Sequence, residues 1–251
     1  MDFKKKNNIL IFTPTYNEAE NIEKLLSMLI GLNINADFLV IDDGSPDGTA
    51  MLIKQFSSNN PHQLIHLIER KEKKGIGSAH LMAIDFANHN KYLTLITMDA
   101  DFSHQPADIP RFIEAIPNGD VILGSRFNHP ESLAEWGLLR KTITHTGHFL
   151  TKILLGMPFD ASGGLRLYQL NQISPSIFNS LSSKDYEFFF ESLLILHMSG
   201  YKICEIPVVL PARIYGSSKM EFGHMIRGVY RLFLLSLRLH VMRLKFSKFK
   251  A

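Results

Sequence analysis

Two carboxylates, Asp99 and Asp101, stand on either side of Ala100, directly after an apolar, strand-like run. Side chains with this spacing can face one cation if the chain bends, and the exit from a strand permits such a bend. Hard carboxylate oxygens suit Mg²⁺ or Mn²⁺, and Mg²⁺ is usually held by one or two carboxylates together with substrate phosphates. The acidic pair therefore predicts a divalent-metal site for a phosphorylated ligand.

Two other interpretations of the acidic pair stay open. Aspartate is common at helix N-caps, so Asp101 or Ser103 could instead cap a helix that begins near Pro106. The aspartyl-phosphate phosphatases also place Asp-x-Asp at a strand end, with the first aspartate as nucleophile. That motif is expected on an early strand, whereas Asp99 follows the fourth strand-like run of this chain. We therefore rank phosphatase chemistry below metal-assisted phosphate binding.

Polar segments also follow three further strand-like runs, at residues 13–18, 42–49 and 124–126. Ligands of open α/β sheets bind beyond the carboxyl ends of the strands, so we expect these segments to meet the acidic pair at one edge. Asp43 offers acceptors for ribose hydroxyls or a base N–H, and Tyr16 could stack on a base. Taken singly, segments 13–18 and 42–49 are better explained as turns with a helix cap.

The strand-like runs also predict the fold class. They are residues 9–12, 38–41, 64–68, 92–98 and 121–123. Apolar strands without clean alternation indicate a parallel sheet covered on both faces, so we expect a βαβ series and an α/β fold. The later chain predicts a helix around residues 136–155, a turn-rich stretch at 160–166, a helix at 186–198 and a strand at 203–210. Residues 74–79 lack a full GxGxxG motif and predict a flexible loop that enters a helix.

Composition places the chain among ordinary folded proteins. It has 251 residues, 45% of them hydrophobic and 20% charged, which allows one sizeable core. A formal net charge of +3 is too small to predict a nucleic-acid partner. The single cysteine, Cys204, excludes an internal disulfide, and no Cys/His spacing resembles a zinc site. We see no secretion signal and no apolar stretch near the ~20 residues that cross a bilayer, so we expect a soluble or peripheral cytoplasmic protein.

Taken together and in this order, the polar segments resemble those of the inverting family 2 glycosyltransferases of GT-A fold. The likeness is strongest to the dolichol-phosphate (polyprenol-phosphate) mannose synthases. The matching segments span nearly the whole chain: residues 14–18, 42–49, 75–79, 98–104, 124–127, 162–168 and 213–220. One such motif is weak evidence, whereas seven in the same order are strong. The resemblance implies a Rossmann-like, mostly parallel sheet with helices on both faces.

The resemblance also implies roles for individual residues. Those that would contact the donor nucleotide sugar are Pro14, Tyr16, Glu18, Asp43, Gly75, Asp99, Ala100, Asp101, Arg213 and Lys219. Those that would bind the acceptor phosphate are Arg126, Arg140 and Thr144, and the metal ligands would be Asp99, Asp101 and Ser103. Catalysis would depend on Asp99, Asp101, Arg126 and Arg213. Arginine suits phosphate oxygens because it binds them bidentately, although a single arginine more often forms a surface ion pair.

The function implied by the resemblance is transfer of mannose from GDP-mannose to a polyprenyl phosphate with inversion, assisted by Mg²⁺ or Mn²⁺. A phosphate monoester is already an oxyanion at neutral pH, so such an acceptor needs no general base. Three alternatives stay open. They are a UDP-glucose donor with the same lipid acceptor, another family 2 transferase acting on a cell-envelope glycan, and a peripheral protein that binds nucleotide sugar without turnover.

Residues 223–251 predict a basic amphipathic helix that follows a catalytic domain at residues 1–222. On a helical wheel Arg227, Arg231, Arg238 and Lys245 share one stripe, and apolar residues occupy other faces. Such a helix can lie on a membrane surface with its apolar side down, which fits a peripheral protein at a cytoplasmic membrane face. It can equally pack on the domain with its basic face in water.

Overall fold

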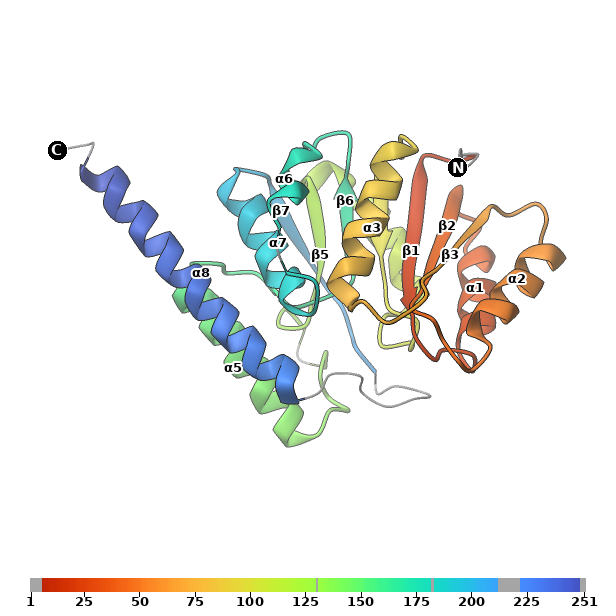
Figure 1. Cartoon of the computed structure of the whole chain (residues 1–251), viewed down its shortest axis with the longest axis horizontal. Coiled ribbons are helices and arrows are strands. Elements are labelled where there is room, and N and C mark those ends of the chain that lie inside the picture. The colour runs from red at the N-terminus through yellow and green to blue at the C-terminus, as the bar shows by residue number, and fades with distance from the viewer. Residues whose placement is uncertain (1–5, 130, 182, 212–221, 249–251) are drawn as a thin grey trace.

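The computed structural model describes residues 6–129, 131–181, 183–211 and 222–248. A seven-stranded sheet lies at the centre, with helices on both of its faces (Figure 1). The strands are β1 (Ile9–Thr15), β2 (Ala36–Asp42), β3 (Ile65–Glu69), β4 (Thr94–Thr97), β5 (Val121–Ser125), β6 (Arg166–Gln169) and β7 (Ile203–Pro207). The helices are α1 (Ile22–Gly31), α2 (Thr49–Asn59), α3 (Ile76–His89), α4 (Ile109–Glu114), α5 (Leu138–Leu155), α6 (Ser176–Asn179), α7 (Glu187–Met198) and α8 (Phe222–Lys248), with short 3₁₀ turns η1 (Pro106–Asp108) and η2 (Ile116–Asn118).

The sheet is mostly parallel, as predicted. Its order is β3-β2-β1-β4-β6-β5-β7, and the pairs β3–β2, β2–β1, β1–β4 and β5–β7 are parallel. Every residue of β2 is buried, and all of them except Asp37 and the final Asp42 are apolar, as expected for a strand covered on both faces. The α/β prediction with a mostly parallel sheet is therefore confirmed.

Strand β6 was not among the predicted strands. It runs antiparallel to both β4 and β5, and only four residues of it pair. Its first residue, Arg166, is fully buried, which strand patterns do not anticipate. The guanidinium is accommodated because it donates to the carbonyl oxygens of Ala161 (3.0 Å), Gly163 (2.8 Å) and Phe189 (2.9 Å).

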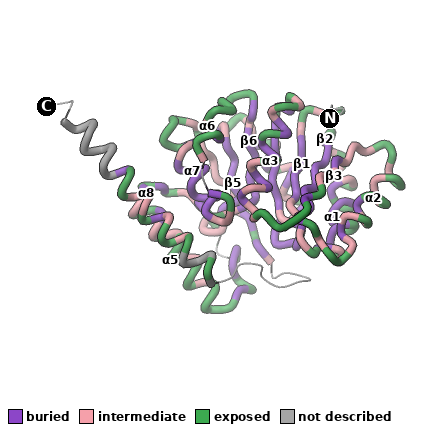
Figure 2. Tube along the Cα trace, viewed as in Figure 1, coloured by how far each residue is buried: buried purple, intermediate pink, exposed green. Residues whose placement is uncertain are grey.

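Separate apolar clusters cover the two faces of the sheet. Along β1, Leu10 and Phe12 join the cluster that contains α3 and α7 side chains, whereas Ile11 joins the cluster that contains α1 and α4 side chains. This division follows from the alternation of side chains along a strand. The buried residues of α1 recur at the spacing of one helix face: Ile22, Leu25, Leu26 and Leu29. Figure 2 shows the buried sheet between partly exposed helices.

The strand order reverses between β1 and β4. From β1 the chain proceeds outward through β2 and β3, and then returns to place β4 on the other side of β1. In open α/β sheets the ligand crevice lies beyond the carboxyl ends of the strands at such a reversal. The segments that follow β1 and β4 start side by side here, because the Met98 N–H donates to Phe12 O at 3.0 Å.

Helices α5 and α8 lie side by side at one end of the sheet (Figure 1). Two ion pairs join α8 to the segment around α7: Arg227 Nη2 lies 3.3 Å from Asp185 Oδ2, and Arg231 Nη2 lies 2.5 Å from Glu191 Oε1. Of the predicted basic stripe, Arg231 is largely buried against the domain, whereas Arg227 and Arg238 are exposed, so only Arg231 departs from the expectation that the stripe faces water or lipid. Lys245 has no described side chain. Within the described residues, no helix combines the length and apolar character required to cross a bilayer.

Candidate active site

The acidic pair lies on a sharp bend directly after β4. Residues 100–104 form consecutive bends, and Phe102 has φ of 59°, a left-handed conformation that is unusual for a bulky residue. Asp101 Oδ1 accepts hydrogen bonds from the Ser103 N–H (3.0 Å) and the Ser103 Oγ–H (2.6 Å). Asp101 is buried, whereas 31% of the Asp99 side chain is exposed. The bend required for two carboxylates at i and i+2 to share a ligand is therefore present, and neither Asp101 nor Ser103 caps η1.

A buried histidine fixes the backbone at the acidic pair. The Asp99 N–H donates to His104 Nδ1 at 2.9 Å. Nδ1 also lies 3.8 Å from Asp99 Oδ2, so the imidazole contacts both the backbone and the side chain of Asp99. Beside them lies Gly164, where a Cβ would stand 3.3 Å from His104 and 3.6 Å from Asp99 Oδ1. The acidic pair and the 162–168 segment thus meet.

The loops after β1 and β2 interlock at the same edge. Asp42 Oδ1 accepts from Thr15 Oγ1 (2.9 Å) and Ser45 Oγ (2.5 Å). The Glu18 N–H donates to Thr49 Oγ1 at 3.0 Å, and the buried Glu18 carboxylate accepts from Asn21 Nδ2 at 2.7 Å. Segments 14–18 and 42–49 therefore form one hydrogen-bonded unit. Pro14 lies in β1 at the start of this unit. It is half-buried and lies opposite Ile41 of β2.

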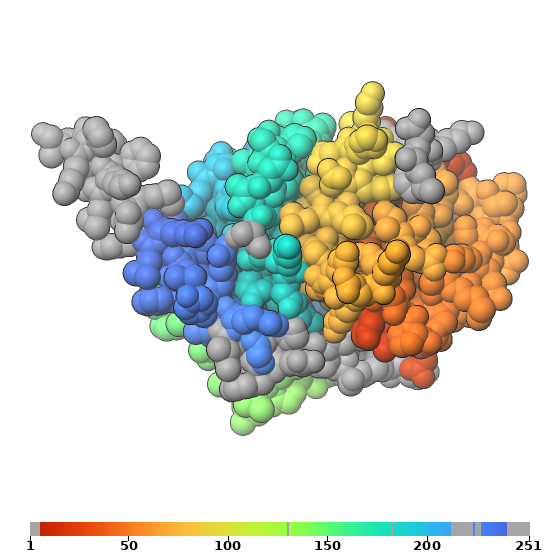
Figure 3. All heavy atoms as spheres, viewed as in Figure 1, coloured from red at the N-terminus to blue at the C-terminus, as the bar shows by residue number. Residues whose placement is uncertain are grey.

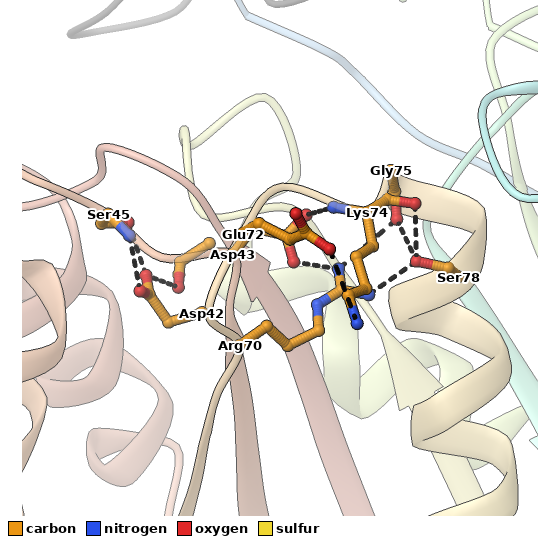
Figure 4. A network of polar contacts seen from close by, with 9 residues as sticks. Asp42, Asp43, Ser45, Arg70, Glu72, Lys74, Gly75 and Ser78 are labelled. Atoms are coloured by element: carbon orange, nitrogen blue, oxygen red, sulfur yellow. Dashed lines mark hydrogen bonds and ion pairs between the residues drawn. The ribbon is translucent and has the colours of Figure 1, made fainter.

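Asp43 lies in a network with the end of β3 and the start of α3 (Figure 4). Its Oδ1 forms an ion pair with Arg70, and its Oδ2 accepts from the Lys74 N–H at 3.3 Å. Burial raises the pKa of the Asp43 carboxyl above its usual value, and the Arg70 charge opposes this effect without cancelling it. Arg70 was not among the predicted site residues. A signal existed, because Arg70 follows the third strand-like run by two residues and the strand-end rule applies there as well.

The ring of Tyr16 is half-buried beside the loop between β3 and α3. Lys73 Nζ lies 4.8 Å from the ring centroid, in a cation–π contact. Gly75 is the N-cap of α3 with φ of 89°, and a Cβ there would stand 2.6 Å from Lys184 O. Residues 74–79 thus enter a helix as predicted, but α3 already begins at Ile76, and Gly75 is in close backbone contact rather than in an open loop.

Arg126 is held by a carboxylate that sequence reasoning missed. Its Nε donates to Asp160 Oδ2 (2.7 Å), and its Nη2 donates to Asp160 Oδ1 (2.5 Å) and Ser162 Oγ (2.6 Å). Burial alone would raise the pKa of Asp160, but the Arg126 charge and hydrogen bonds outweigh burial and bring it below its usual value. The Asp160 N–H donates to Glu205 Oε1 at 2.7 Å, which ties the pair to β7. No local sequence signal links residues 34 positions apart.

The remaining predicted residues lie on α5, between the two aspartates, or outside the described residues. Arg140 is exposed, with its Cζ 3.4 Å from the centroid of the Trp136 ring, and Thr144 is half-buried one turn further along. Ala100 is buried between the two aspartates. Arg213 and Lys219 lie outside the described residues.

The donor atoms at the bend suit a hard divalent cation. They are the carboxylate oxygens of Asp99 and Asp101 and the hydroxyl of Ser103, all of them oxygen ligands. Among the described residues, no group of three or more His, Cys, Asp or Glu side chains could hold a metal by itself. A cation at the bend would thus need oxygens from a ligand, as phosphates provide.

A model of glycosyl transferase family 2 matches residues 10–170, which include both N-terminal loops, the acidic pair and the Arg126–Asp160 ion pair. The chain belongs to this family. Membership of family 2 makes this protein a glycosyltransferase. Of the predicted site residues, Arg213 and Lys219 lie outside the matched range.

Two curated relatives cover most of the chain. An undecaprenyl-phosphate mannosyltransferase of Micrococcus luteus is 32% identical over 216 residues, which cover 86% of this chain and 88% of that protein. A polyprenol monophosphomannose synthase of Mycolicibacterium smegmatis is 29% identical over 225 residues, which cover 89% of this chain and 84% of that protein. The family resemblance inferred from the motifs is confirmed.

Solved structures show the same fold at low sequence identity. Glucosyl-3-phosphoglycerate synthase of Mycobacterium tuberculosis, in complex with Mn²⁺, UDP and glucosyl-3-phosphoglycerate, superposes with a TM-score of 0.64 at 17% identity, covering 91% of this chain and 79% of that one. A mannosyltransferase of Pyrobaculum calidifontis, in complex with GDP-mannose and Mn²⁺, gives a TM-score of 0.52 at 17% identity, covering 84% and 59%.

Proposed function

We propose that this protein transfers mannose from GDP-mannose to the phosphate of a polyprenyl phosphate, with inversion at the anomeric carbon. The observation that carries the proposal is the acidic pair on its bend, placed where the strand order reverses. The names of the two curated relatives support the mannose and the polyprenyl phosphate.

The donor would lie across the loops that follow β1, β2 and β4. Asp99 and Asp101, with Ser103 beside them, would hold Mg²⁺ or Mn²⁺, and the Mn²⁺ in the two solved relatives supports this choice. When bound, the cation neutralises charge that develops on the departing diphosphate. Pro14, Tyr16, Glu18 and Asp43 would contact the nucleoside, since their loops form one hydrogen-bonded unit beside the acidic pair.

The reaction requires a positioned phosphate rather than a base. An acceptor phosphate oxygen attacks the anomeric carbon as the bond from that carbon to the donor diphosphate breaks, and GDP leaves with the bonding electrons. The attacking oxygen carries no proton at neutral pH, so no side chain has to remove one. The product is a lipid-linked sugar phosphodiester of inverted configuration.

The cationic residues divide into two groups in this proposal. Arg126 is charge-compensated by Asp160, so its first task is to hold residues 160–164 beside Asp99. Arg140 is exposed at the start of α5 and, with Thr144 one turn later, would receive the acceptor phosphate. Arg213 and Lys219 keep the diphosphate-binding roles implied by the motif that contains them.

The lipid part of the acceptor would be reached at a membrane surface, at its cytoplasmic face. Helix α5 exposes Leu138, Leu139, Phe149 and Ile153, and α8 exposes Val229, Tyr230, Phe233 and Leu237. These residues are the apolar faces of α5 and α8. Large exposed apolar areas of this kind mark interaction sites, and a lipid acceptor supplies the matching partner. Figure 3 shows α8 (blue) along the molecular surface, next to the green of α5.

A matrix of donors and acceptors tests the proposal. The purified protein is incubated with GDP-mannose, GDP-glucose, UDP-glucose or UDP-N-acetylglucosamine, with Mg²⁺ or Mn²⁺, and with a short polyprenyl phosphate or the matching polyprenol. We expect mannosyl-phosphoryl-polyprenol from GDP-mannose and the phosphate acceptor, and its loss with EDTA. Product from UDP-sugars alone would overturn the donor assignment. Product from the free alcohol would overturn the mechanism without a base.

A further inference from the structure

Arg70 is a buried cation directly after β3, at the donor edge of the sheet. Only 4% of its side chain is exposed, and 10% of the side chain of its partner, Asp43, is exposed. Both charges are therefore largely removed from water, which is costly unless each is paired and hydrogen-bonded. Such a buried pair is expected where the position of the two side chains matters for function.

The guanidinium of Arg70 joins three elements of the fold (Figure 4). One nitrogen pairs with Asp43, which follows β2. Nη1 donates to Ser78 Oγ at 2.6 Å, and Nη2 reaches Gly75 O at 3.4 Å, both at the start of α3. The Arg70 backbone N–H completes the connection by donating to Asp42 O at 2.8 Å.

Lysine could not replace this arrangement. A planar guanidinium presents several donors in a fixed fork, so it can hold a carboxylate and a hydroxyl at once, whereas an ammonium acts as a single point charge. The charge also counters the burial that raises the pKa of Asp43. Arg70 thus favours Asp43 in its ionised form, which accepts hydrogen bonds without donating one.

The backbone around Arg70 leaves little space for the loops to move. Gly44, next to Asp43, has φ of 72°, and a Cβ there would stand 3.0 Å from Arg70 O. On the other side, the Ser78 N–H donates to Lys184 O at 2.9 Å, close to the contact of Gly75 with the same carbonyl. The Arg70 side chain spans the gap between these two close-packed turns.

We propose that Arg70 is a positioning residue for the donor nucleotide, which fixes the Asp43 carboxylate and the start of α3 without touching the donor itself. The inference rests on the proposed function, in which Asp43 contacts the nucleoside. It assigns Arg70 to donor binding and not to the transfer step.

Steady-state kinetics of Arg70→Met, Arg70→Lys and Ser78→Ala test the proposal. We expect Arg70→Met to raise the donor KM roughly tenfold, the effect of losing a charged hydrogen bond. We expect kcat at saturating donor and the acceptor KM to stay within about twofold. Arg70→Lys should recover part of the donor KM, because it keeps a charge beside Asp43, and Ser78→Ala should give a smaller rise. The matched control is Arg111→Met, which removes an arginine from an exposed ion pair with Asp108.

A double-mutant cycle with Asp43→Asn separates positioning from a purely structural role. If Arg70 acts through Asp43, Arg70→Met should weaken the binding of GDP with Mn²⁺ much less in the Asp43→Asn background than in the wild type. Equal losses in both backgrounds, or a lower kcat with an unchanged donor KM, would overturn the proposal. GDP and UDP binding with Mn²⁺ is measured by calorimetry, so the result stands whichever sugar is transferred. Should Arg70→Met fail to fold, Arg70→Lys and Ser78→Ala decide by the same donor KM.

Discussion

The two aspartates of the acidic pair have different surroundings, and the difference sets what substitutions should do. Asp101 is buried and accepts two hydrogen bonds from Ser103, so its orientation is fixed before any ligand arrives. Asp99 has a more exposed carboxylate and a backbone held by His104. Asp101 is therefore preorganised, whereas Asp99 is accessible. A site that must admit a diphosphate requires both properties.

Asp101→Asn should reduce turnover by about 1,000-fold or more, since it removes a charged metal ligand while keeping the side-chain volume. The far-ultraviolet circular dichroism spectrum should stay that of a folded α/β protein. Asp108→Asn, at an exposed ion pair on η1, is the matched control and should keep normal turnover. Near-normal activity of a folded Asp101→Asn variant would remove the metal role.

His80 is a second residue whose surroundings make a prediction. It lies on α3 among Phe12, Phe188 and Phe189, with ring-centroid distances of 5.2, 5.3 and 5.0 Å. Neither ring nitrogen has a hydrogen-bond partner among the described residues. Burial, with a smaller contribution from the Arg166 charge, lowers the pKa of His80 to about 3. The native state therefore holds a neutral histidine.

This depressed pKa should make stability depend on pH. The unfolded chain binds a proton near the ordinary histidine pKa of about 6.5, whereas the folded chain does not, so the contribution is fully present above that value. It should be lost as the pH falls from 6.5 towards 3, with a slope of up to ~1.4 kcal/mol per pH unit. Urea unfolding of His80→Leu at several pH values should show this part of the slope removed. His62→Gln, at an exposed histidine, should retain it.

At the scale of elements, α3 is closely packed against the chain before α7, near the site. A Cβ on Gly77 would stand 2.5 Å from Asp185 O and 2.6 Å from Phe188 Cβ. Real Cβ atoms do not approach backbone so closely, so one of the two elements would have to move. The same junction supports Gly75 and Ser78, and through them the Arg70 network.

Gly77→Ala should therefore destabilise the protein by about 1–3 kcal/mol, the usual cost of overpacking. Gly147→Ala is a control with the opposite sign. Gly147 lies inside α5 with no atom near its added Cβ, so alanine should stabilise the helix by about 0.5–1 kcal/mol. Urea midpoints measured together provide the comparison. Two shifts of the same direction would contradict the packing argument.

The elements that could be predicted from the sequence are those with a local signal. Continuous apolar runs located β1 to β5, and the strand-end rule brought Asp43 and the acidic pair to one edge. β6 was not predicted because it is short and begins with a buried arginine, one of whose acceptors, Phe189 O, is 23 residues away in the sequence. The role of Asp160 and the ion pairs of α8 were not predicted, because the paired residues are distant in the sequence.

At the scale of the whole molecule, α8 has different surroundings on its two sides. It packs on the domain through three buried leucines, Leu232, Leu235 and Leu239. It also leaves its opposite side uncovered, where Phe233 is 54% exposed, and the neighbouring α5 exposes 59% of Phe149. Packing on the protein and contact with a lipid surface are therefore compatible, because they use different faces.

Charge substitutions on these faces should release the protein from membranes. Phe149→Glu with Ile153→Glu on α5, or Phe233→Glu with Leu237→Glu on α8, should weaken binding to vesicles of phosphatidylglycerol and phosphatidylethanolamine by roughly 100-fold. Flotation with vesicles measures the effect. Met28→Glu with Met51→Glu, at exposed methionines of α1 and α2, is the matched control. Undiminished flotation of both helix variants would rule out these faces as the membrane contact.

The antiparallel strand β6 has a consequence for synthesis on the ribosome. β6 lies between β4 and β5, yet residues 98–165 separate it from β4 in the sequence. Until Gln169 has emerged, β4 presents an unpaired edge, and β5 waits for both of its partners, β6 and β7. Exposed strand edges favour pairing between nascent chains. The demand for chaperones should therefore be greatest during translation of the segment before β6, and the speed of elongation there should affect the yield of folded enzyme.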